Sequence, residues 1–210
     1  MHERTIGLIL RNRPLTETSL IVHWLTRDLG RLATVAKGAR RPKSPFHGKL
    51  DLFYLAEFTF VRSRRSELHL LGEVALGETH PALRRELTLL QQATYCAALI
   101  EQTTEMDTPL PTMFELMVGL LKHLPPQAPR AESTFAFEMK LLHALGLRPD
   151  FEKAKLSAGA QQILDQFVKM DWPALTRLKL ADRQITEIRQ FLHGFLIYHL
   201  GRIPKGREVH

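Results

Sequence analysis

The chain has 210 residues, and its 29 Lys and Arg outnumber 22 Asp and Glu, which gives a formal net charge of +7. The content of 44% hydrophobic and 24% charged residues is typical of a folded globular protein and argues against a disordered tail. The positive balance favours a polyanionic partner, either a nucleic acid or an acidic membrane surface.

A single cysteine, Cys96, excludes an internal disulfide framework and a zinc site built from several thiolates. In its apolar surroundings we expect a buried structural thiol, in a reducing compartment. No apolar run approaches the ~20 residues of a membrane-spanning helix, and the run at residues 6–10 is too short for a signal peptide. These features predict a cytoplasmic protein.

The first 80 residues have the apolar pattern of β-strands, and no helix-length periodic segment interrupts them. Five strands are expected, at residues 6–10, 20–25, 31–36, 52–61 and 68–76. Short turns connect most of them, with a turn at 28–30 and a hairpin loop at 63–66. Five short strands suit a small closed barrel of the oligonucleotide/oligosaccharide-binding (OB) type better than a sandwich, which normally has about seven.

From Pro81 onward the apolar residues recur at helical spacing. Pro81 suits a first helical position, residues 112–115 form a capping-box pattern, and Gly146 suits a helix end. Further helix starts are expected at three capping side chains, Ser133, Ser157 and Asp182. Because each helix must bury its apolar stripe against another, they are expected to form one domain.

The predicted fold class is therefore α+β. A five-stranded OB-fold β-barrel over residues 1–80 would bind nucleic acid, and an all-α helical domain would follow over residues 81–210.

The sequence lacks the motifs of several enzyme classes. It contains no phosphate-binding loop, dinucleotide-binding fingerprint, esterase nucleophile elbow or zinc-protease helix motif. Its ten histidines are dispersed and lack the close spacings of metal ligands. We therefore expect no enzyme, no metal site and no cofactor.

The positive charge is concentrated in the first part of the chain, where residues 1–80 carry 13 basic and 8 acidic side chains. Within it, the acid-free segment 31–49 holds six cations: Arg31, Lys37, Arg40, Arg41, Lys43 and Lys49. Arginine supplies bidentate phosphate contacts and lysine a point charge, so this segment is the first candidate for DNA binding. Such contacts carry no sequence information, so we expect weak sequence preference.

Other candidate contacts lie outside this set of cations. Phe46 falls in a predicted loop and is a candidate for stacking on a base, whereas aromatic residues that alternate along the strands are expected to form core. The secondary basic candidates are Arg64 and Arg65 in the hairpin loop and Arg202, Lys205 and Arg207 near the end of the sequence.

The residues alone leave two alternatives open. The basic loop also fits an OB-fold protein that binds RNA. It also fits a non-catalytic interaction scaffold, in which the positive charge only confers solubility.

Several segments resemble the RecO recombination-mediator family of bacterial DNA repair. They are residues 7–10 (GLIL), 13–22 (RPLTETSLIV), 25–31 (LTRDLGR) and 35–41 (VAKGARR). A further match near the end of the sequence is residues 198–202 (YHLGR), followed by Lys205 and Arg207. The segments occur in the order and with the spacing that the family shows, and together they extend over nearly the whole chain.

The resemblance implies an OB barrel followed by a helical domain, in a nucleoid-associated protein that binds single- and double-stranded DNA. It implies that the protein anneals complementary strands and acts with RecR to load the recombinase on strands coated by single-stranded-DNA-binding protein (SSB). It also implies that the helical domain offers a groove to the acidic, hydrophobic C-terminal tail of SSB, which the sequence does not locate.

One feature of the family is missing from the sequence. Many members carry a four-cysteine zinc module after a Gly-Leu-x-Pro element, which here is residues 146–149. This chain reaches Ser157 within a few residues and has one cysteine. The resemblance therefore implies a member in which the zinc module is absent near residues 150–156.

Overall fold

The computed structural model describes residues 2–124, 130–151, 154, 156–175 and 177–207. The chain forms two compact units. The barrel unit comprises Met1–Pro81 and Thr104–Glu115, and the helical unit comprises Ala82–Thr103 and Leu116–His210. The two units do not divide the chain at a single point, because residues 104–115 belong to the barrel unit.

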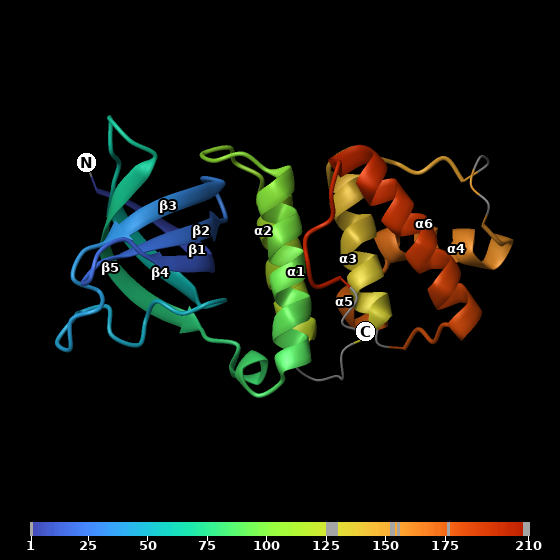
Figure 1. Cartoon of the computed structure of the whole chain (residues 1–210), viewed down its shortest axis with the longest axis horizontal. Helices are drawn as coiled ribbons and strands as arrows, with labels where there is room; N and C mark the ends of the chain where they lie inside the picture. The colour runs from blue at the N-terminus through green and yellow to red at the C-terminus, as the bar shows by residue number, and fades with distance from the viewer. Residues whose placement is uncertain (1, 125–129, 152–153, 155, 176, 208–210) are drawn as a thin grey trace. The chain divides into compact units, whose positions relative to one another are not determined.

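The barrel unit is built on five strands, β1 (His2–Pro14), β2 (Leu20–Thr26), β3 (Arg31–Ala36), β4 (Leu55–Val61) and β5 (Leu68–Glu78). They close into a barrel in the order β1-β2-β3-β5-β4 (Figure 1). All neighbours are antiparallel except β3 and β5, which run parallel. A closed, five-stranded barrel with one crossover is the OB fold, as the sequence predicts.

Aromatic side chains fill the interior of the barrel. Trp24 and Phe58 stack with ring centroids 4.0 Å apart, and the Trp24 indole nitrogen donates to the Thr34 hydroxyl at 2.8 Å. Trp24, Phe58 and Phe60 are fully buried, as expected for alternate residues that share one face of a strand. A side chain at Gly7 would place its Cβ 2.8 Å from the Phe58 ring, so the core requires glycine there.

The segment 104–115 packs against the start of β3. Met106 forms a parallel bridge with Arg31, and the Asp107 backbone nitrogen donates to the Arg31 carbonyl at 2.9 Å. Gly30 allows this close approach, because a Cβ at its positive φ of 74° would lie 2.0 Å from the Thr108 carbonyl oxygen. The sequence shows no apolar period here, so this association with the barrel was not predicted.

The described helices are η1 (Pro81–Arg84), α1 (Leu87–Thr103), α2 (Pro111–His123), α3 (Ala131–Ala144), α4 (Ala158–Lys169), α5 (Trp172–Leu175) and α6 (Asp182–Leu200). Within the helical unit, α3 packs against α1, α4 and α6. Apolar side chains of α3, α4, α5 and α6 form its core, which includes Phe135, Leu164, Phe167 and Leu192. Cys96 is buried in α1, as predicted.

One predicted helix cap is confirmed: the Ser157 hydroxyl accepts from the Ala160 backbone nitrogen at 3.3 Å. The other predicted starts were displaced. α3 begins after Arg130, which leaves Ser133 buried inside the helix, and α6 begins after Ala181, whose nitrogen donates to the Gln184 side chain. The first turn of α3 is thus a buried one, whereas α6 begins with a local hydrogen bond between an exposed Ala181 and Gln184.

The helix starts predicted near Pro81 and at residues 112–115 also differ from the observed ones. α2 begins at Pro111, so residue 112 is its second residue and no capping box forms there. Pro81 opens the short 3-10 helix η1, and α1 starts only at Leu87. Gly146 has a positive φ of 74° just after α3, as predicted for a helix end. Among the described helices, none is both long and apolar enough to cross a membrane.

Candidate nucleic-acid interface

The basic segment follows β3 and is folded as a chain of tight turns against the open end of the barrel. Backbone nitrogens of Arg41, Ser44, His47 and Lys49 each donate to the carbonyl three residues earlier, at 3.0–3.1 Å. Leu50 is buried, and its carbonyl accepts from the Asn12 side chain at 2.9 Å. The segment thus has a fixed shape although it contains no strand or helix.

Four cations of this segment, Lys37, Arg40, Arg41 and Lys43, are exposed. The Arg40 backbone nitrogen donates to Thr18 at 3.0 Å and its guanidinium to Thr16 at 3.3 Å, which ties this cation to the β1–β2 hairpin. Within the part of the chain that the structure describes, none of the four forms an ion pair. We name these four residues the cationic loop.

Two other predicted contacts in this segment serve the barrel itself. The half-buried Lys49 donates through its ammonium group to the Val74 carbonyl at 3.1 Å. The half-buried Arg31 donates to the Thr104 carbonyl and so fastens the segment 104–115. Because both side chains donate to backbone oxygens of the barrel unit, we do not include Lys49 and Arg31 in the cationic loop.

Phe46 does not have the exposed ring that the sequence suggested. Only 8% of its surface is accessible, and it packs in the barrel core with Leu50 and Phe60. The turns of the segment fold it back over the barrel end, so burial of the ring is what anchors the loop. The structure thus shows the packing role of Phe46 and no open ring, and a contact between Phe46 and DNA stays a prediction.

A second group of arginines surrounds His23, on β1 and the start of β3. Burial, followed by the charges of Arg11, Arg13 and Arg31, lowers the pKa of His23 to about 4. Among the residues that the structure describes, the buried Nε2 of His23 has no hydrogen-bond partner, in agreement with a neutral ring. Arg11 and Arg13 are exposed on the part of β1 that pairs with β2, opposite His23 and Ile21.

Sequence reasoning missed Arg11 and Arg13. The available signal was their alternate spacing directly after the apolar run at residues 6–10, which places both side chains on one face of a strand.

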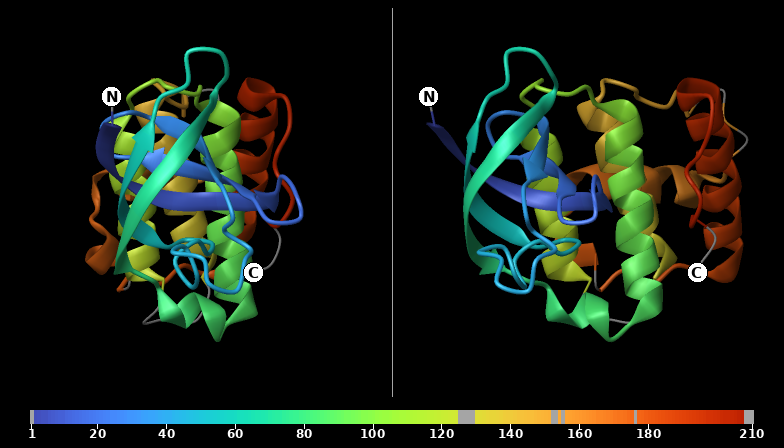
Figure 2. Two further views of the ribbon diagram at one scale, coloured as in Figure 1. Left: turned by 90° about the vertical axis from the view of Figure 1, so that its left-hand side faces the viewer. Right: turned by 60° about the vertical axis from the view of Figure 1, so that its left-hand side comes forward.

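Arg64 and Arg65 are exposed at the tip of the β4–β5 hairpin. In Figure 2, left, this hairpin lies at the top of the barrel and the segment after β3 lies at the bottom. Their neighbour Arg62 is engaged instead, with Glu3 at 2.9 Å and with Asp107, and these two hydrogen bonds raise its pKa. The structure therefore does not bring Arg64 and Arg65 together with the cationic loop.

The candidates near the end of the sequence divide in two. Arg202 and Lys205 are exposed, but Arg207 is buried and its guanidinium pairs with both oxygens of the fully buried Glu138, at 2.7 and 2.9 Å. The Tyr95 hydroxyl donates to the same carboxylate at 2.6 Å. Burial acts to lower the pKa of Arg207, yet the hydrogen bonds and charge of Glu138 raise it. Arg207 thus fastens the last described residues to α3 and, unlike Arg202 and Lys205, is not exposed, so its role as a DNA contact stays a prediction.

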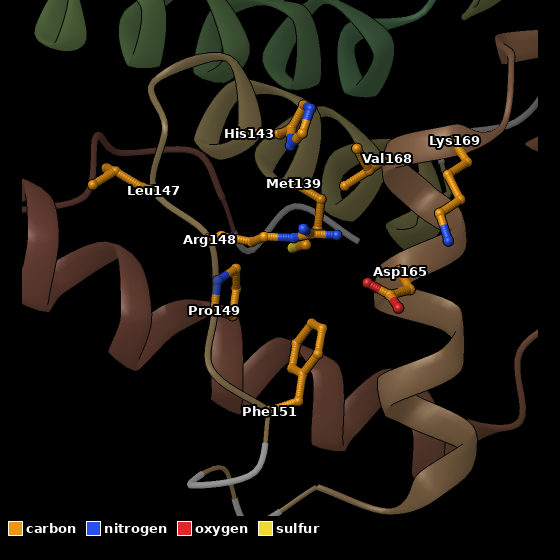
Figure 3. Close-up of a pocket in the computed structure, with 9 residues that line it drawn as sticks. All are labelled: Met139, His143, Leu147, Arg148, Pro149, Phe151, Asp165, Val168 and Lys169. Carbon is orange, nitrogen blue, oxygen red and sulfur yellow. The ribbon is translucent and has the colours of Figure 1, made fainter.

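The helical unit contains a pocket of about 300 Å³ between α3, α4 and the chain that follows α3. Its apolar lining includes Met139, Phe151 and Val168, and its polar lining consists of His143 and the charged side chains of Arg148, Asp165 and Lys169. Figure 3 shows Arg148 reaching into the pocket from one side and Asp165 from α4 on the other.

No group of three or more metal-ligating side chains occurs among the residues that the structure describes. The region 150–156, where the resemblance implies loss of the zinc module, contains residues 152, 153 and 155, which lie outside the described residues.

The fold and the site define an OB-barrel protein with a cationic loop at the barrel end and an added helical unit. Residues 1–80 match the family model for the N-terminal part of recombination protein O, and residues 84–154 match the model for its C-terminal part. The chain belongs to the recombination protein O (RecO) family, as its sequence motifs indicate.

Three relatives are each named DNA repair protein RecO. The protein of Rhodopirellula baltica is 33% identical over 144 residues, which are 69% of this chain and 53% of the relative. Those of Listeria monocytogenes and Myxococcus xanthus are 30% and 32% identical over 154 residues, which are 73% of this chain and 60% and 63% of the relatives. The chain therefore spans between half and two thirds of the length of these relatives.

Proposed function

We propose that this protein is a non-enzymatic recombination mediator in DNA repair. It binds single- and double-stranded DNA, anneals complementary strands and, with RecR, helps load the recombinase on strands coated by SSB. The observation that carries the proposal is the cationic loop, whose four exposed cations have no acidic partner in the described structure. Family membership and the relatives' name support the role in repair.

Annealing requires no bond chemistry, but it requires two polyanions to approach each other. A cationic surface lowers the repulsion between strands by neutralising phosphates and releasing condensed counterions. Arg40 and Arg41 supply planar guanidinium groups, and Lys37 and Lys43 supply point charges on flexible stems. Because these groups contact the backbone, binding should show little dependence on base sequence.

The pocket of the helical unit supports the proposed interaction with the SSB tail. An acidic, hydrophobic peptide needs an apolar surface for its side chains and cations for its carboxylates. Met139, Phe151 and Val168 offer the first, and Arg148 and Lys169 offer the second. Binding of a peptide with this composition should weaken in the double variant Arg148→Ala, Lys169→Ala and should persist in the cationic-loop variant described next.

The proposal is tested by a fluorescence annealing assay with SSB-coated single strands. In the triple variant Lys37→Ala, Arg40→Ala, Arg41→Ala, DNA binding and annealing should fall together while the fold is retained. A matched control removes three exposed cations of the helical unit, in Lys122→Ala, Lys179→Ala, Arg183→Ala. Annealing that survives in the triple variant would show that the cationic loop is not the site.

Competition between DNA and RNA oligonucleotides separates this proposal from an RNA-binding role. Preferential displacement by RNA would favour the RNA-binding alternative. Affinity that does not change with salt would favour the scaffold alternative, since phosphate contacts are strongly salt-dependent.

A further inference from the structure

A second hollow lies at the end of the barrel, directly behind the cationic loop. It measures about 260 Å³ and is formed by the start of β2 and by the segment that connects β3 to β4. Its apolar wall includes Leu20, Ala39, Phe46 and Tyr54. The mouth of a β-barrel is a common position for ligand sites, and this one adjoins the cations described above.

The segment that carries the exposed cations also forms most of this hollow. Ala39 lies between Lys37 and Arg40 in the chain, and Phe46 follows Lys43 by three residues. A strand held through its phosphates by the cationic loop would therefore pass next to an apolar, aromatic recess. Packing of Phe46 into the core and the turn hydrogen bonds of the segment fix the recess before any ligand binds.

Polar groups in the lining indicate which part of a nucleotide can enter. His47 and Asp51 line the hollow, and the Asp51 carboxylate is held by the Leu52 backbone nitrogen at 2.7 Å. A carboxylate repels phosphate, so the anionic part of the strand is excluded from the hollow itself. An uncharged base, with an aromatic face and polar edges, is complementary both to the apolar wall and to these polar groups.

We propose that the hollow behind the cationic loop, here named the barrel-mouth pocket, accepts one unpaired nucleobase of a single strand. The inference rests on the proposed function and deepens it, because it gives this end of the barrel a site that binds unpaired bases and not paired ones. In a duplex the bases are stacked and paired, and extruding one costs free energy, so a duplex engages the cationic loop alone. The pocket thus adds affinity for single strands beyond what charge provides.

The test separates base contacts from phosphate contacts by using three probes of equal length. They are a single strand with normal bases, a strand composed of abasic sites, and a duplex, each measured by fluorescence anisotropy. The wild-type chain should bind the normal strand about fivefold or more tighter than the abasic strand, because stacking of one base supplies a difference of that size.

Ala39→Leu fills part of the pocket without altering charge. It should abolish the preference for the normal strand while the affinities for abasic strand and duplex stay unchanged. Ala75→Leu is the matched control, because it makes the same change at an exposed position of β5 outside the pocket. Tyr54→Leu, at the other end of the segment that connects β3 to β4, is the second variant should Ala39→Leu impair folding.

The inference is overturned if the wild-type chain binds the normal and abasic strands equally, or if both pocket variants keep the preference. The pocket would then be available to another occupant, such as an apolar side chain of a protein partner. A failure of the proposed function looks different: all three probes would bind without dependence on salt, or would not bind at all.

Discussion

The buried ion pair between Arg207 and Glu138 leads to a sharp prediction about stability. In Arg207→Met, the apolar length of the side chain is retained and the guanidinium is lost. Both hydrogen bonds to the carboxylate disappear. Among the residues that the structure describes, the Tyr95 hydroxyl is then its remaining side-chain donor. Glu138 is fully buried, so water does not replace the lost partner unless the chain end moves away.

Removing one partner of a buried pair typically costs 3–5 kcal/mol, against at most about 1 kcal/mol for an exposed pair. Arg207 lies close to the end of the sequence, and local opening there admits water to Glu138, so we expect the lower end, about 3 kcal/mol. In a Glu138→Gln background the same substitution should cost markedly less, because no charge is left unpaired.

The measurement is urea unfolding of the four proteins of this double-mutant cycle, followed by circular dichroism. Binding of single strands by folded Arg207→Met should equal that of the wild-type chain, because Arg207 does not face solvent. A loss below about 1 kcal/mol would mean that the pair behaves as a surface pair. A loss of DNA affinity at unchanged stability would restore Arg207 as a DNA contact.

Three further predictions concern the barrel and its ligands. As the pH falls from 6.5 toward 4, unfolded His23 binds a proton that the folded, half-exposed ring does not. Stability should therefore fall by about 1 kcal/mol, and His23→Gln should reduce this slope in urea unfolding at several pH values. A bound DNA strand would neutralise the charges of Arg11 and Arg13 and thereby favour the protonated form of His23. The DNA affinity of the wild-type chain should therefore rise below pH 6 more than the DNA affinity of His23→Gln. Phe46→Ala should cost about 3 kcal/mol of stability in the same assay and Phe46→Leu much less; equal, small losses would contradict its role as a core anchor.

The strands show which parts of the fold could be predicted from the sequence. β3 has the predicted bounds, because its buried residues and the turn at Gly30 are local signals. β1 extends well beyond residues 6–10, since its polar ends pair with β4 and β2 without an apolar pattern to mark them. The OB topology followed from the number and spacing of the strands, as the family match also implies.

The positive charge of the candidate site could be predicted from the sequence, but the burial of individual side chains near it could not. The acid-free run of cations predicted the cationic loop from local sequence, because charged side chains are exposed unless a distant residue pairs with them. The burial of Phe46 and Arg207 was missed because their environments come from residues far along the chain, such as Phe60 and Glu138. No local pattern distinguishes a loop phenylalanine that is buried from one that is exposed.

The salt dependence of single-strand affinity tests the role of the cationic loop most directly. For single strands the slope of log affinity against log salt is about 0.7 per phosphate neutralised. Lys37→Ala, Arg40→Ala, Arg41→Ala should therefore reduce the wild-type slope by about 2, and the control Lys122→Ala, Lys179→Ala, Arg183→Ala should leave it unchanged. An unchanged slope in the first variant, or an equal reduction in both, would contradict the assignment of the DNA site to the cationic loop.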